Sequence, residues 1–178
     1  GIYHNSHFPI ALMYWAVAMI MLFRRPRDSA SQLFVLVCLM GTLGVVMWLL
    51  ASLGIAWASM LMSAVVLAVG PAFVHYHTVF PEPINFRGKR KLLASLYGVA
   101  LVLLLLATGS DLMYYLQMDL NGYIPPGLGP VIKVFFSLCL FIGIVLLIRT
   151  RFVTQSETTR RKVMLVVIST AVAVIPLI

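Results

Sequence analysis

The architecture is clearest in residues 67–91, which read LAVGPAFVHYHTVFPEPINFRGKRK. A long apolar segment ends here in Pro81 and Pro83, and the basic run 87–91 follows directly. Proline lacks a backbone N–H and clashes with the preceding turn, so the helix is expected to stop near Pro81. Lys and Arg concentrate in the short cytoplasmic loops of membrane proteins. The stretch therefore predicts the cytoplasmic end of a membrane-spanning helix.

The composition of the whole chain agrees with this interpretation. Hydrophobic residues make up 62% of the 178 residues and charged residues only 10%, whereas a soluble domain has about 25% charged residues. We expect an all-α integral membrane helical bundle. The net charge of +8 could indicate a nucleic-acid partner in a soluble protein. Here the basic residues lie in loops between spans, so no nucleic-acid partner is expected.

Six segments are long and apolar enough, or nearly so, to cross the bilayer, which takes about 20 residues. They are residues 8–23, 32–53, 55–80, 92–108, 130–148 and 163–178. The last is short for a full crossing at about 1.5 Å per residue. We expect one transmembrane domain, residues 1–178, that is a fragment of a longer chain.

The basic residues predict how these spans are oriented. The loops after the first, third and fifth spans hold 3, 4 and 5 of the 13 Lys and Arg residues, 12 in all. Strict alternation of six spans places these three loops on one side, which is the cytoplasm by the positive-inside rule. The N-terminus is then outside. The remaining basic residue, Lys133, lies just inside the fifth span and can extend outward to the headgroups.

Small residues and prolines predict local features. Gly54 indicates a tight hairpin between the second and third spans, and Pro71 favours a bend in the third. Small residues let membrane helices approach closely. Two groups of them are expected at helix contacts: Gly41 and Gly44 in the second span, and Ala56, Ser59, Ser63 and Gly70 in the third. Residues 111–119 are expected to form a short interfacial helix or to extend the fourth span. Cys38 and Cys139 lie in apolar segments and are expected to be buried, unpaired thiols.

The histidines are the first candidates for a metal or cofactor site. His75 and His77 are two residues apart, so on a helix they point in nearly opposite directions and cannot share one metal ion. Two histidines from different spans could still hold a haem or chlorophyll, which leaves a cofactor-holding subunit as an alternative. The chain has no hydrolase or nucleotide-binding motif. We therefore predict no catalytic residue, no metal and no cofactor in this stretch.

The residues around His75 resemble a family. His75, Phe80, Pro81 and Pro83, with the basic run and LLASLYGVALVLLLLA after it, resemble the multi-span sensor region of bacterial sensor histidine kinases, including those of competence and quorum sensing. That region has the pattern F-x-H-F-x-x-x-F-P-x-P. A second likeness is ETTRRK at 157–162, which opens the last span. The resemblance covers residues 72–178, and the sequence departs from it at Tyr76, His77 and Lys162.

The resemblance implies a sensory, signal-transducing domain of a two-component system in the bacterial plasma membrane. It implies a homodimer in the lipid bilayer that passes a peptide or small-molecule signal to a cytoplasmic output domain outside this stretch. The longest outer connection, residues 110–129, is the expected ligand-facing element. Its aromatic and acidic residues are Asp111, Tyr114, Tyr115, Asp119 and Tyr123.

Two other classes of function remain open at this point. Six spans with little charge inside the membrane would also suit a structural or cofactor-holding subunit of a larger membrane complex. A transporter is the further alternative, although none of the spans has an Asp or Glu in its middle, where proton-coupled transporters usually carry one.

Overall fold

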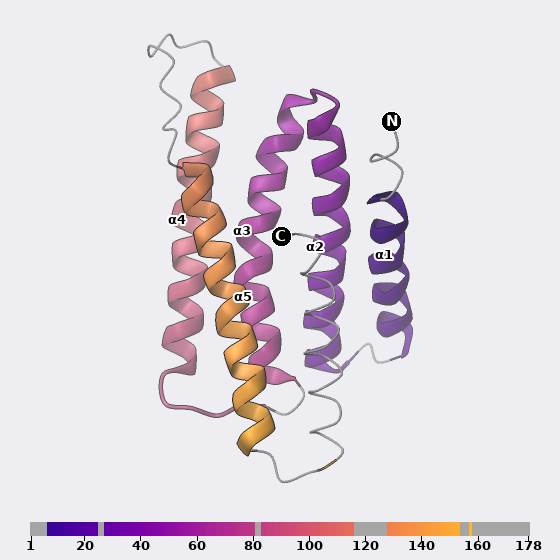
Figure 1. Ribbon diagram of the computed structural model, residues 1–178, viewed down its shortest axis with the longest axis vertical. Coiled ribbons are helices and arrows are strands. Elements are labelled where there is room, and N and C mark those ends of the chain that lie inside the picture. Colours follow the sequence, from indigo (N-terminus) through magenta and orange to yellow (C-terminus); the bar gives the residue numbers. More distant parts are fainter. Residues whose placement is uncertain (1–6, 25–26, 81–82, 116–127, 154–156, 158–178) are drawn as a thin grey trace.

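The computed structural model describes residues 7–24, 27–80, 83–115, 128–153 and 157 (Figure 1). These residues form five helices and, within the described ranges, no strand: α1 (His7–Arg24), α2 (Ser29–Ser52), α3 (Ala56–Val79), α4 (Lys89–Tyr115) and α5 (Leu128–Val153). The predicted all-α class is confirmed.

Four of the helices, α2 to α5, are long and apolar enough to cross a membrane. The first predicted span coincides with α1, which has 18 residues and a shorter apolar part. The sixth predicted span, residues 163–178, lies outside the described residues. The described part of the chain is therefore all-helical, with four helices of membrane-spanning length and composition.

Helices α4 and α5 are longer than the predicted spans that they contain. Helix α4 begins at Lys89 and continues to Tyr115, and α5 continues past Arg149 to Val153. The prediction followed apolar residues only, but Lys and Arg are good helix formers, so a helix can continue beyond its apolar part. The expected extension of the fourth span is confirmed as far as Tyr115.

Helix α3 is the centre of the bundle (Figure 1). It packs against α2, α4 and α5, whereas α1 packs on α2 and lies at the edge. Helices α4 and α5 touch each other much less than either touches α3. Among the four long apolar helices, α3 has the largest share of buried residues. It is thus the element that joins α1 and α2 to α4 and α5.

Successive helices run in alternating directions (Figure 1). The ends of α1, α3 and α5 therefore lie at the same end of the bundle as the starts of α2 and α4. We call this the basic end, because Arg24 ends α1, Lys89 begins α4 and Arg149 lies near the end of α5.

Local sequence explains how the α1–α2 and α2–α3 connections are built. The Oδ2 atom of Asp28 accepts hydrogen bonds from the backbone N–H of Ser31 at 3.2 Å and from its hydroxyl at 2.9 Å, which caps the start of α2. Gly54 has φ 81°, a conformation that suits glycine. The N–H of Ile55 donates to the carbonyl of Leu50 at 3.1 Å. The predicted tight hairpin is confirmed.

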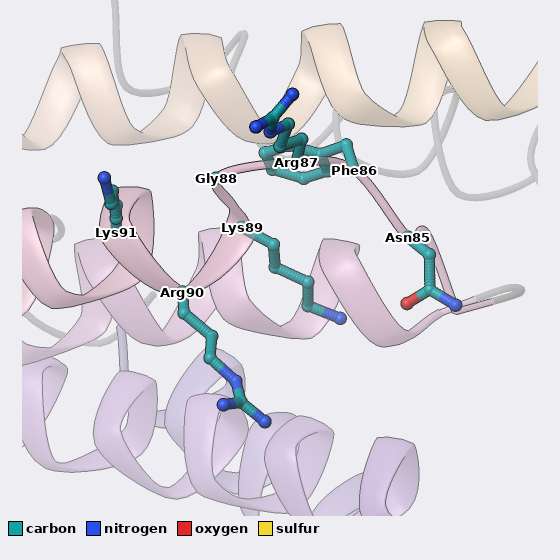
Figure 2. Close-up of a pocket in the computed structure, with 7 residues that line it drawn as sticks. All are labelled: Asn85, Phe86, Arg87, Gly88, Lys89, Arg90 and Lys91. Carbon is teal, nitrogen blue, oxygen red and sulfur yellow. The ribbon is translucent and has the colours of Figure 1, made fainter.

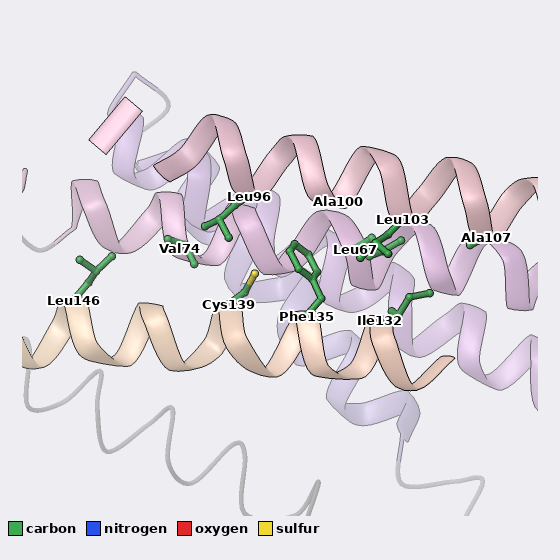
Figure 3. Close-up of a cluster of buried hydrophobic side chains, with 10 residues drawn as sticks. All are labelled: Leu67, Val74, Leu96, Ala100, Leu103, Ala107, Ile132, Phe135, Cys139 and Leu146. Carbon is green, nitrogen blue, oxygen red and sulfur yellow. The ribbon is translucent and has the colours of Figure 1, made fainter. Parts of the chain in front are cut away.

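The main core lies between α3, α4 and α5 (Figure 3). Its members are buried apolar side chains from all three helices: Leu67, Val74, Leu96, Ala100, Leu103, Ala107, Ile132, Phe135, Cys139 and Leu146. A smaller cluster of Ala18, Val35 and Cys38 joins α1 to α2. Both cysteines are buried and unpaired, as predicted.

Small residues lie at some of the predicted helix contacts. A Cβ atom on Gly70 would lie 3.1 Å from the Sγ atom of Cys139, and one on Gly44 would lie 3.3 Å from Cγ1 of Val65. Ser59 is exposed in the single chain, and its carbonyl accepts a hydrogen bond from the hydroxyl of Ser63 at 3.2 Å.

A polar and an aromatic contact add to the apolar cluster between α1 and α2. The hydroxyl of Thr42 donates to the carbonyl of Ala11 at 3.3 Å. The ring of Tyr14 lies 3.9 Å from where a Cβ atom on Gly41 would be. A small residue at 41 therefore lets the tyrosine ring lie flat on α2.

Candidate functional site at the basic end of helix α3

The last two turns of α3 hold two histidines that face different helices. His75 is half-buried and faces α4, where it meets Tyr97. His77 is buried and faces α5, where it meets Gly143. The prediction that the two imidazoles point in different directions is confirmed.

His75 makes a polar contact with the neighbouring helix. Its Nδ1 atom lies 3.5 Å from the hydroxyl of Tyr97, at the outer limit of hydrogen bonding. The two rings meet edge to face, with centroids 6.3 Å apart. The backbone carbonyl of His75 also accepts a hydrogen bond from the hydroxyl of Thr78 at 2.7 Å. This contact joins α3 to α4.

His77 is packed tightly on every side for which neighbours are described. Its side chain is 1% exposed. The ring of Phe73 meets it edge-on at 4.3 Å between centroids, and the ring of Tyr76 lies at 5.0 Å. A Cβ atom on Gly143 would lie 3.1 Å from Cδ2 of His77 and 2.5 Å from Cε1 of Phe73. Only glycine lets the α5 backbone approach α3 this closely.

Burial of the His77 imidazole is energetically unfavourable. Among the described residues neither of its ring nitrogens has a hydrogen-bond partner. A neutral imidazole has one N–H donor and one acceptor nitrogen, and each buried polar group without a partner costs about 1–3 kcal/mol. The contact between α3 and α5 at Gly143 therefore combines tight packing with an unfavourable polar group.

Tyr76 joins the same turns to α2. Its ring lies 5.6 Å from the ring of Phe34 and stacks on that of Phe80 at 5.2 Å. Three adjacent residues of α3 thus contact three different helices: His75 contacts α4, Tyr76 contacts α2 and His77 contacts α5. A rotation or shift of α3 here would change all three contacts together.

The loop after α3 is tied back to the same place. The carbonyl of Thr78 accepts hydrogen bonds from the N–H of Ile84 at 3.0 Å and from Nζ of Lys89 at 3.1 Å. The guanidinium of Arg149 lies over the ring of Phe86, 5.9 Å from its centroid. The start of α4 and the end of α5 are therefore both fastened to this loop.

The predicted site residues are divided between the two ends of the bundle. Phe80 follows α3 at the basic end, and Pro81 of the same motif lies outside the described residues. Asp111, Tyr114 and Tyr115 lie in the last turns of α4, at the opposite end. The other two proposed ligand-facing residues, Asp119 and Tyr123, also lie outside the described part. A ligand-binding role for these five remains a prediction.

The positions of the described His, Cys, Asp and Glu side chains show where a metal ion or a tetrapyrrole could bind. No group of three or more His, Cys, Asp or Glu side chains that could hold a metal ion occurs in the described ranges. Both ring nitrogens of His77 are enclosed by protein, and the α5 backbone lies against the ring at Gly143. A tetrapyrrole could bind this imidazole only if α3 and α5 first moved apart.

Sequence reasoning missed the partners of His77, which are Phe73 and Gly143, and the role of Lys89. One signal was present. Gly143 is the one glycine in the bulky apolar segment 138–148, and glycine in a membrane helix lets another helix approach closely.

A comparison of the chain with protein-family models, with curated proteins and with solved structures finds no match in any of the three.

Proposed function

We propose that this chain is the sensory membrane domain of a bacterial sensor histidine kinase. In this proposal six spans cross the plasma membrane, the N-terminus is outside, and the domain acts as a homodimer. A signal received outside or within the membrane is passed to a cytoplasmic output domain. The likeness around His75 and Phe80 and the distribution of basic residues support the proposal.

One observation carries the proposal: adjacent residues at the end of α3 contact α2, α4 and α5 through Tyr76, His75 and His77. Signal transmission needs an element with two arrangements whose balance can be shifted. Because α3 joins the two halves of the bundle, a change in its position alters the packing of both.

The contact between His77 and Gly143 provides a reason for two arrangements. Close packing of α3 on α5 favours the arrangement described here, and the unsatisfied imidazole opposes it. A second arrangement, in which α3 turns so that the imidazole reaches a polar partner or the headgroups, would lose packing and gain hydrogen bonds. Two such arrangements can differ by only a few kcal/mol.

The signal would enter at the other end of the bundle. A peptide or small molecule that contacts the last turns of α4, at Asp111 and Tyr115, would shift α4 relative to α3. The contact of Tyr97 with His75 would carry this shift to the basic end. Such a ligand can bias the two arrangements only by the difference between its affinities for them.

The test measures autophosphorylation in inside-out membrane vesicles. The vesicles contain the full-length protein, that is, this chain together with the proposed output domain. Gly143→Ala places a methyl group against Phe73 and His77, at an overpacking cost of about 1–3 kcal/mol. We expect basal autophosphorylation to change by about tenfold, since 1.4 kcal/mol corresponds to a factor of ten. Gly98→Ala is the matched control, because a Cβ atom there meets nothing within 4 Å.

Two results would reject the proposal. One is the absence of ATP-dependent phosphorylation in vesicles that contain the full protein. The other is an equal activity of the Gly143→Ala and Gly98→Ala proteins.

The proposed topology has its own test. Single cysteines replace Ser52, beside the α2–α3 turn, or Arg87, in the α3–α4 loop, and intact cells are treated with a membrane-impermeant maleimide. The proposal expects labelling at position 52 from outside the cell and labelling at position 87 only after the membrane is opened. The reverse pattern would show that the N-terminus is inside.

A further inference from the structure

The loop between α3 and α4 forms a hollow with a strong positive charge (Figure 2). It is lined by residues 85–91, which include Arg87, Lys89, Arg90 and Lys91. The hollow lies at the basic end, where α4 begins. The N-terminus of a helix also carries a partial positive charge, which adds to that of the side chains.

The four cations have different surroundings. The ammonium of Lys89 donates to the carbonyl of Thr78 and so serves to hold the loop. Figure 2 shows Arg87 and Lys91 pointing to one side of the loop, the side on which α5 appears in this view, while Arg90 points to the opposite side. None of these three makes an ion pair with a described residue that would neutralise it.

The end of α5 adds to the positive charge on this side. Arg149 lies over Phe86, the residue directly before Arg87. Arg149 of α5 therefore lies on the same side of the loop as Arg87 and Lys91, which point toward α5 in Figure 2. Three cations without a described acidic partner are a strong attraction for a phosphate group.

Apolar side chains suitable for acyl chains are exposed within about two helical turns of these cations along the chain. Val145 and Ile148 of α5 precede Arg149 by about one turn or less, and Val99 of α4 follows Lys91 by about two turns. The two helices touch each other little, so exposed apolar side chains of both are available to a lipid. A ligand with a phosphate and two hydrocarbon chains satisfies both features.

We propose that this loop binds the headgroup of an anionic phospholipid. Arg87 and Lys91 hold the phosphate, Arg149 adds charge, and the acyl chains lie along α4 and α5. Clusters of Lys and Arg at the cytoplasmic end of a membrane helix attract anionic lipids, each cation contributing about fivefold in affinity. The site does not depend on the sensory function, and its test does not involve signalling.

The test is native mass spectrometry of the purified 178-residue chain in detergent, titrated with phosphatidylglycerol or with phosphatidylcholine. We expect tighter binding of phosphatidylglycerol. The double variant R87Q/K91Q should weaken that binding by about 25-fold, at about fivefold for each charge. The matched control R24Q/R27Q removes two charges from the neighbouring α1–α2 connection and should leave the affinity unchanged.

Single variants sharpen the test and remain usable if a double variant does not fold. R87Q should weaken binding and R90Q should not, since the two side chains point to opposite sides of the loop (Figure 2). An equal loss in R87Q/K91Q and R24Q/R27Q would show diffuse attraction and overturn the proposal. Equal affinity for the two lipids would also overturn it. Complete displacement of the lipid by inorganic phosphate would show an anion site that is not specific for lipid.

Discussion

Replacing His77 by leucine should stabilise the protein, although it alters one of the most buried side chains. His77 is 1% exposed and its ring nitrogens have no partner among the described residues. Leucine is apolar and of similar size, so it can fill the same space between Phe73 and Gly143 without a polar group. Replacing an unsatisfied polar group by an apolar one of the same shape is neutral or stabilising.

The magnitude follows from two opposing terms. Two unsatisfied groups at about 1–3 kcal/mol each give about 2–6 kcal/mol in favour of the leucine variant. Loss of the edge-to-face contact between Phe73 and His77 reduces this stabilisation by about 0.5–1.5 kcal/mol. The free energy of unfolding should therefore rise by about 1–5 kcal/mol. We expect the lower half of this range, because a branched side chain must fit against Gly143.

The assay is unfolding of the purified chain in mixed micelles by increasing SDS, followed by helical circular dichroism. His75→Leu is the matched control, since it makes the same change two residues away. There the imidazole has Tyr97 as a partner, so the same substitution should lower the free energy of unfolding by about 0.5–1.5 kcal/mol. The two histidines should thus respond with opposite signs.

A clear result would refute this reasoning. If His77→Leu lowers the free energy of unfolding as much as His75→Leu does, then His77 makes hydrogen bonds that stabilise the fold. The argument for a competing arrangement of α3 would then lose its basis.

Three further predictions use the same unfolding assay. Gly143→Ala should cost about 1–3 kcal/mol, and less in a Phe73→Ala background because the ring that meets the new methyl group is gone; equal costs in both backgrounds would contradict the contact. Tyr97→Phe should lower the free energy of unfolding by about 0.5–1.5 kcal/mol. In a His75→Leu background the same change should have no further effect, and additive losses would mean that the hydroxyl has another partner. Asp28→Ala should cost about 0.5–2 kcal/mol through loss of the α2 cap and Asp28→Asn much less; equal losses would show that charge and not capping matters.

Much of the fold could be predicted because two features of the sequence agree on where helices begin and end. These are the lengths of the apolar segments and the positions of the basic loops between them. Arg24 and the run 87–91 end one apolar segment and precede another, so α1 to α4 could be located without knowledge of packing. The end of α5 could not, because backbone hydrogen bonding continues this helix beyond its apolar segment, past Arg149 to Val153, and hydropathy does not record it.

The site was harder to predict for a different reason. A helix that is apolar all round gives no periodic signal of which face meets which neighbour, and α3 is apolar along most of its length. The spacing of His75 and His77 predicts that their rings point in different directions, but not which helix each one meets. The contact of His77 with Gly143 depends on how α5 packs on α3. Neither the sequence of α3 nor that of α5, taken alone, determines this packing.

The turn between α2 and α3 has a consequence for how the protein enters the membrane. It consists of Leu53, Gly54 and Ile55 and contains no charged group. In the proposed orientation this turn is the first connection that must be moved across the bilayer during synthesis, and moving a charged side chain into hydrocarbon is costly. Because no ion has to cross, α2 and α3 can insert together as one hairpin, with the basic residues at its two open ends left behind in the cytoplasm.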